Sequence, residues 1–252
     1  MLKRVFLLII FAAVISAASA FGSPIVKEKT YADEVAAVEL ASDKTGIKDE
    51  LDDKSLKQIL ADVLTIKGGK IGEIISKFLS NTSHWVWLVV EGGLPENVNG
   101  LTQLTSDGAQ TILDGEKFQN ATPLSVARTI LHEMIHAYLT LYFMYDAENA
   151  RKDYPAILNE WMTSKDPDYN NIQHDEIERS FIDDIALALD EYSETVGLVN
   201  DDKHVYTDLA WGGLDFQNNI QLTADTKKRI QNRLLAEQLN KTFGTETPVA
   251  FK

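Results

Sequence analysis

One stretch of the sequence, residues 122–142, limits the possible folds more than any other. Thr122 can cap the free amides at the start of a helix, and Pro123 suits the first helical position. Apolar residues then recur at the spacing that places them along one side of a helix. They are Ala127, Ile130, Leu131, Met134, Ile135, Tyr138, Leu141 and Tyr142. We therefore expect a long helix here, as the central element of the fold.

Shorter patterns on both sides of this helix predict further elements. The aromatic and β-branched residues from His84 to Val90 are typical of a buried strand, and Ala109–Leu113 fits an edge strand. Helices are predicted over 56–64, 71–78, 154–162, 177–192 and 224–239, with a short one over 32–41 and a connection over 205–214. Because helices outnumber strands, we predict an α+β fold that is mainly helical, with a small sheet packed on the central helix.

The first twenty residues have the layout of a secretory signal peptide. Lys3 and Arg4 precede an apolar run, and Ala18-Ser19-Ala20 fits a cleavage site. That run is too short for a membrane-spanning anchor. We expect a signal peptide over 1–20, a flexible lead-in over 21–54, a single domain over 55–241 and a tail over 242–252. The predicted location is secreted or periplasmic, by bacterial export, with no stable membrane insertion after cleavage.

Charge and cysteine content exclude several classes of function. The chain has 38 acidic and 24 basic residues, a net charge of −14, which argues against a nucleic-acid partner and against docking on anionic lipid. It has no cysteine, so disulfides, thiolate metal sites and cysteine nucleophiles are excluded. An exported chain of this kind must be held together by its core alone.

Within the central helix, residues 132–136 read His-Glu-Met-Ile-His. Residues four apart lie on adjacent turns of a helix, so the rings of His132 and His136 can reach one ion. Zn²⁺ accepts imidazole nitrogens at about 2.0–2.1 Å, and a catalytic zinc usually has three protein ligands and a water. Glu133 can reach that water without ligating the metal and is the predicted general base. We therefore predict one catalytic Zn²⁺ at this motif.

The third metal ligand must come from a separate element. We favour His174, which lies three and seven residues before the apolar Ile177 and Phe181 and therefore points to the packed side of its helix. We expect His174 to open that helix, whose positive end favours a neutral imidazole. The alternative is Glu160, because many zinc peptidases take their third ligand from a glutamate on a later helix. His84 is interpreted as a core histidine.

Residues 125–139 (SVARTILHEMIHAYL) resemble the active-site helix of the zincin metallopeptidases. Together with the Gln-His-Asp sequence at 173–175 and residues 208–214 (DLAWGGL), they resemble bacterial zincin-like peptidases and the SprT-like arrangement, in which a histidine is the third ligand. The resemblance covers about residues 101–214. It implies a small zincin fold and one zinc held by His132, His136 and His174, with Glu133 as the catalytic residue.

The sequence also departs from several zincin branches. No glycine-containing extension follows His136 at the metzincin spacing, and the surroundings of Glu160 match the thermolysin-like pattern poorly. SprT-like proteins act near DNA, whereas this chain is acidic and carries an export signal. A DNA-related role is therefore not carried over.

The sequence thus predicts a secreted zinc metallopeptidase that hydrolyses the peptide bonds of a polypeptide substrate. A further group should stabilise the oxyanion, and an aspartate can orient a ligand imidazole through a hydrogen bond. The candidates are Tyr206, His204 and Tyr169 for the first role, and Asp208 and Asp175 for the second. The alternative function is a catalytically inactive zincin-fold protein-binding module that retains a zinc, although binding alone does not require Glu133. Cleavage specificity, oligomeric state and latency are left open.

Overall fold

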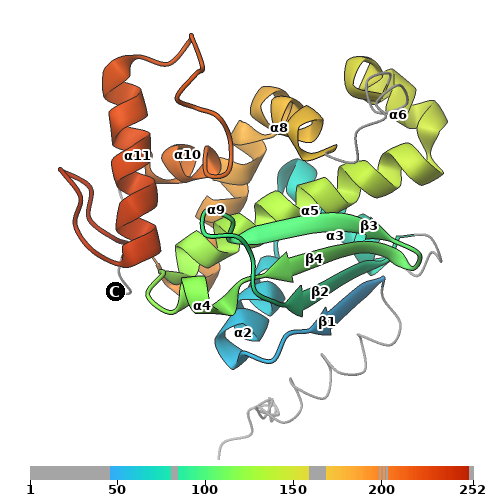
Figure 1. The fold of residues 1–252 in the computed structure, drawn as a ribbon, viewed down its shortest axis with the longest axis horizontal. Helices are drawn as coiled ribbons and strands as arrows, with labels where there is room; N and C mark the ends of the chain where they lie inside the picture. The colour runs from blue at the N-terminus through green and yellow to red at the C-terminus, as the bar shows by residue number, and fades with distance from the viewer. Residues whose placement is uncertain are drawn as a thin grey trace, which may run out of the picture.

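A computed structural model of the chain describes residues 46–80, 85–158, 169–198, 200, 202 and 204–249. These residues form an α+β fold that consists of helices and one four-stranded sheet, with the helices packed mainly on one face of the sheet (Figure 1). The strands are β1 (Ile47–Glu50), β2 (Trp87–Glu91), β3 (Gly100–Thr105) and β4 (Gly108–Leu113), and the helices are α2 (Lys54–Val63), α3 (Gly69–Leu79), α4 (Gly115–Phe118), α5 (Pro123–Tyr145), α6 (Ala147–Asp153), α8 (Tyr169–Ser180), α9 (Ile182–Val196), α10 (His204–Ala210) and α11 (Ala224–Leu239). The predicted fold class is confirmed.

The strands lie in the order β1-β2-β4-β3. β1, β2 and β4 run parallel, and β3 runs antiparallel to β4. The prediction of an edge strand at Ala109–Leu113 is wrong, because β4 lies between β2 and β3. β3 takes the edge position, and the sequence does not reveal it because its buried side chain is the polar Thr102. An alternation of apolar and polar residues is therefore absent.

Both ends of the predicted domain also need correction. Residues 47–50 are not part of a flexible lead-in, since β1 pairs with β2 along its whole length and Leu51 is buried. Residues 242–249 are not a loose tail, since Val249 is buried and Glu246 forms an ion pair with the buried Arg233. The domain therefore extends beyond 55–241 in both directions.

The long helix α5 is the central element, as predicted. Thr122 caps it by accepting a hydrogen bond from the Ser125 amide at 3.2 Å, and Pro123 is its first residue. The helix packs on β3 and β4 on one side and on α2 and α9 on others (Figure 1). Every residue from Leu124 to Leu139 is buried. Its polar residues are therefore enclosed rather than exposed to solvent along one face.

The helices after α5 differ from the prediction in two places. The single helix expected over 177–192 is two helices, α8 and α9, which meet at the buried Phe181. The expected connection over 205–214 is mostly helix α10, whose Val205 and Leu209 are fully buried. The helices predicted over 56–64, 71–78 and 224–239 correspond to α2, α3 and α11.

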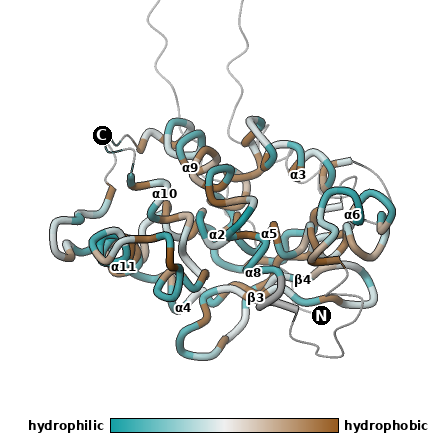
Figure 2. Tube along the Cα trace, turned by 90° about the horizontal axis from the view of Figure 1, so that it is seen from above, coloured by the Kyte–Doolittle hydropathy of each residue, from teal (hydrophilic) through white to brown (hydrophobic). Residues whose placement is uncertain are grey.

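Some predicted elements fall where the structure gives no description. Residues 1–45, with the signal peptide and the helix predicted over 32–41, lie outside the described residues. So do His84 and residues 159–162 of the helix predicted over 154–162, of which 155–158 are helical. Within the described part, none of the helices combines the length and apolar character needed to cross a membrane. In Figure 2 the largely hydrophilic helices α6 and α11 lie on opposite sides of the molecule, with α5 between them.

Candidate metal centre

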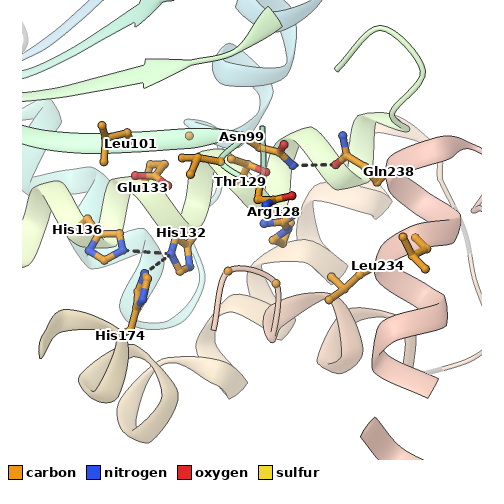
Figure 3. Close-up of a pocket in the computed structure, with 16 residues that line it drawn as sticks. Asn99, Leu101, Arg128, Thr129, His132, Glu133, His136, His174, Leu234 and Gln238 are labelled. Atoms are coloured by element: carbon orange, nitrogen blue, oxygen red, sulfur yellow. Dashed lines mark hydrogen bonds between the residues drawn. The ribbon is translucent and has the colours of Figure 1, made fainter. Parts of the chain in front are cut away.

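Three histidine rings meet at the middle of α5. The Nε2 atoms of His132 and His136 are 3.1 Å apart, and His132 Nε2 is 3.3 Å from His174 Nε2 (Figure 3). One nitrogen from each ring lies within 4.8 Å of the other two. His132 and His136 come from adjacent turns of α5, and His174 comes from α8, which packs against it. The structure thus brings together the three ligands predicted from the sequence.

The spacing of these nitrogens fits a tetrahedral metal ion. Two imidazole nitrogens at about 2.05 Å from a tetrahedral Zn²⁺ are about 3.3 Å apart. The Nε2 separations of 3.1 Å between His132 and His136 and of 3.3 Å between His132 and His174 are close to that value. Three imidazole nitrogens that converge in this way, two of them buried, suit a cation that lies between them. The cluster can therefore hold a metal ion.

The ring of His136 is held in the tautomer that metal binding requires. Its Nδ1 lies 2.5 Å from the side-chain Oε1 of Gln173, an acceptor, so Nδ1 carries the proton. Gln173 is itself oriented, because its Nε2 donates to Thr140 Oγ1 at 3.0 Å. Nε2 of His136 is left with a free lone pair directed at the cluster. Such a partner behind a ligand histidine is the usual support of a metal site.

Burial keeps the rings of His132 and His136 neutral. It holds the pKa of His132 well below its usual value, with added repulsion from His136, His174 and Arg128. Burial and the neighbouring His174 lower the pKa of His136 to about 3, although the hydrogen bond to Gln173 opposes this. The prediction that His174 opens its helix is wrong, because α8 begins at Tyr169 and His174 lies within it.

Glu133 is buried beside the cluster and is held by a chain of hydrogen bonds that crosses the sheet. Trp87 Nε1 donates to Thr111 Oγ1 at 2.8 Å, and Thr111 Oγ1 lies 2.7 Å from Thr102 Oγ1. Thr102 Oγ1 donates to Glu133 Oε2 at 2.8 Å. Because Thr102 has a single hydroxyl proton and donates it to Glu133, Thr111 donates to Thr102, and the chain ends at the carboxylate. Strands β2, β4 and β3 thereby fix the orientation of Glu133.

The surroundings of Glu133 tune its acidity towards neutral pH. Burial raises the pKa of Glu133 to about 7, while the Thr102 hydrogen bond and the positive charge of Arg128 lower it in part. A carboxyl group with a pKa near the working pH can both accept and return a proton. Gly100 makes room for it, since a Cβ there would lie 2.8 Å from Glu133 Cγ.

A cavity of about 380 Å³ joins Glu133 to the three histidines. The residues ahead of β3 and at its start form one wall, α5 forms the floor, and α11 and the turn at Gly212-Gly213 close other sides. Its lining includes Asn97, Val98, Asn99, Gly100, Leu101, Arg128, Thr129, Leu234, Leu235 and Gln238. Gly213 has φ +90°, and a Cβ there would lie 3.0 Å from His132 Cε1. The turn therefore packs directly on a ligand ring.

The other residues predicted for the site do not line this cavity. Asp208 is buried and forms two hydrogen bonds with Arg229, of 2.7 and 3.0 Å, so it is paired with a cation rather than with an imidazole. Tyr206 is buried in α10 and His204 is exposed at the start of that helix. Asp175 is exposed and lines a different pocket. Tyr169 is the first residue of α8, and Glu160 lies outside the described residues.

Three functional side chains are missing from the sequence-based set. Gln173 is quoted there only as part of a segment, and Thr102 lies on the unpredicted strand β3. Arg128 does carry a signal in the sequence: it is a charged residue one turn before His132 in a helix that is otherwise largely apolar. Thr102 has no such signal, since its role depends on strand pairing.

Comparisons of this chain with known proteins found no match. Neither a protein-family model, nor a curated protein, nor a solved structure matches this chain.

Proposed function

We propose that this protein is a zinc-dependent peptidase of the zincin type that hydrolyses peptide bonds. The observation that carries the proposal is that three converging histidines and a buried carboxyl group line one cavity. A structural zinc site would need a fourth protein ligand, whereas a catalytic one leaves a position open to water and substrate. Among the described residues, the cluster contains three histidines and no fourth ligand.

The roles of the side chains follow from their positions. A zinc ion held by His132, His136 and His174 supplies Lewis acidity, which polarises a carbonyl and makes water more acidic. Glu133 accepts a proton from the attacking water and passes it to the leaving amine. Thr102 keeps the carboxylate of Glu133 oriented during both transfers. Gln173 holds the ring of His136 in place.

The edge strand β3 supports a peptide as the substrate. It is one of the two terminal strands among the four described, and its first residues line the cavity. The outer edge of a terminal strand carries backbone donors and acceptors that an extended peptide can pair with. Such pairing would bring a peptide bond alongside the metal centre. Export to the periplasm or the medium is part of the same proposal, on the basis of residues 1–20.

The proposal is tested by hydrolysis of a mixed library of synthetic peptides, with mass spectrometry of the products. The zinc-loaded protein lacking residues 1–20 should cleave at least one set of peptides. The matched control is Glu133→Gln, which should retain zinc and lose about 10²–10⁴-fold or more in rate, because an amide cannot accept the proton. Zinc binding without cleavage of any peptide would instead support the binding module.

A further inference from the structure

Arg128 is a buried cation in the wall of the cavity, and it has no hydrogen-bond or ion-pair partner among the described residues. Its exposed fraction is 8%, and its Nε atom is buried with no hydrogen-bond partner. It forms no ion pair and no hydrogen bond with any residue that the structure describes. Yet it lines the same cavity as His132 and Glu133 (Figure 3). An arginine placed in this way is costly unless an anion joins it.

The guanidinium group is held in place by packing. A Cβ at Gly212 would lie 2.7 Å from both Cζ and Nε of Arg128, so the turn at 212–213 leaves just enough room for the guanidinium group. The next residue of that turn, Gly213, packs on His132. One rigid turn therefore fixes the cation and a metal ligand relative to each other. Burial lowers the pKa of Arg128 to about 10, so the group is still charged at neutral pH.

Glu133 does not neutralise this cation. The two groups interact through space, but no ion pair joins them, and the carboxylate of Glu133 is bonded to Thr102 instead. The donors of Arg128 are left for a ligand that enters the cavity. Guanidinium donors form a planar fork that matches a carboxylate.

We propose that Arg128 binds a carboxylate of the peptide substrate, and that this carboxylate is the free C-terminus. The inference rests on the proposed peptidase function. Arg128 precedes His132 by one helical turn, about 6 Å along α5. An extended peptide covers that distance in about two residues. On the side of Arg128 away from His136, the cavity is lined by Leu234, Leu235 and Gln238 of α11, which lies across the path of a chain that continues in that direction (Figure 3).

The protein would thus act near the C-terminal end of its substrate and release one residue or a short fragment. The arginine would select peptides that carry a free terminal carboxylate and would set the distance from that terminus to the bond that is cleaved. An aspartate or glutamate side chain is the other source of the same chemical group.

The test is a binding measurement on zinc-free protein, where no metal can bind the carboxylate. The probes are N-acetyl-Ala-Ala, its C-terminal amide, and N-acetyl-Ala-Asp-amide, titrated by nuclear magnetic resonance. The free acid should bind about 10- to 100-fold tighter than the amide, the range for a hydrogen-bonded charge pair. Arg128→Met should abolish this preference, and Arg128→Lys should keep only part of it because a lysine lacks the fork. Circular dichroism checks that the variants are folded.

Arg151→Gln is the matched control, because it removes an exposed arginine of α6 that does not line the cavity. It should retain the full preference. Equal binding of acid and amide to the wild-type protein, no binding of either, or an unchanged preference in Arg128→Met would each overturn the proposal. Tighter binding of the aspartyl amide than of the free acid would overturn the C-terminal assignment and favour an acidic side chain.

The measurement separates this inference from the function it rests on. If carboxylate binding depends on Arg128 but the zinc-loaded protein cleaves no peptide, the anion site is supported and the peptidase function is refuted. If free-acid and amidated peptides are cleaved at equal rates, the peptidase function is supported and the role of Arg128 in binding the C-terminus is refuted.

Discussion

Replacing Thr102 by valine removes the hydroxyl that bonds to the carboxylate and backbone carbonyl of Glu133 and to Thr111, and changes the shape of the side chain little. The bond from Thr102 Oγ1 to Glu133 Oε2 is 2.8 Å long, and Thr102 is buried. A hydrogen bond to a charged group contributes about 1.5–3 kcal/mol. Since one pKa unit corresponds to about 1.4 kcal/mol, the pKa of Glu133 should rise by about one to two units. At neutral pH the carboxyl group would then be largely protonated and unable to act as a base.

We expect kcat/KM of Thr102→Val on a library-derived peptide to fall by about 10- to 100-fold at neutral pH, and the acidic limb of the pH profile to move to higher pH. The assay is kcat/KM against pH with a quenched fluorescent peptide. Thr105→Val is the matched control: Thr105 lies on the same strand, but its hydroxyl donates to Gly108 O at 3.0 Å, away from the cavity. That variant should keep the wild-type profile.

The reasoning is refuted if Thr102→Val is folded and zinc-loaded and shows the wild-type rate and the wild-type acidic limb. The hydrogen-bond chain from Trp87 would then have no part in setting the acidity of Glu133. A rate loss without a shift of the limb would also contradict the argument, since it would show a change of geometry alone.

Three further predictions concern the site and the fold. Gly213→Ala should weaken zinc binding about 10-fold or more, because the added Cβ would press on the ring of His132. Gly197 also has a positive φ but has open space around it, so Gly197→Ala should bind zinc like the wild-type protein in the same titration. The free energy of unfolding of the metal-free protein should fall by about 1.4 kcal/mol per pH unit as pH falls below about 6.5. The lowered pKa values of His132 and His136 each destabilise the folded state in this range, and the raised pKa of Glu133 offsets one of the two. Urea unfolding at several pH values measures this, and a flat profile would contradict it. Truncation after Lys241 should lower the free energy of unfolding by about 3 kcal/mol in the same assay, because it removes Glu246, the partner of the buried Arg233, and the buried side chain of Val249. An unchanged midpoint would show that residues 242–252 do not stabilise the domain.

The sequence predicts those parts of the fold that repeat a local pattern. The stripe and cap of α5 mark its position, and the spacing within residues 132–136 places two ligands on one face. His174 is predicted from its spacing to Ile177, which reports on the packed side of its helix. The helix break at Phe181 is invisible in that pattern, because the apolar spacing continues through it.

What the sequence does not predict depends on contacts between distant segments. β3 has a buried threonine where an alternating strand would have an apolar residue, and that threonine is bonded to β4 and to α5. The sequence offers Asp208 as an aspartate that orients a ligand imidazole, but in the structure Asp208 forms an ion pair with Arg229. The position of Arg128 in the cavity depends on the turn at Gly212, which is 84 residues away in the sequence and packs on its guanidinium group.

Metal analysis of the purified protein tests the central claim most directly. The wild-type chain should contain one zinc per chain, and so should Glu133→Gln, because Glu133 is not a ligand. His174→Ala should lower zinc affinity by at least the 10- to 100-fold that loss of a supporting residue costs, whereas Glu160→Ala should not. A wild-type protein without metal, or zinc retained in His174→Ala and lost in Glu160→Ala, would contradict the three-histidine centre.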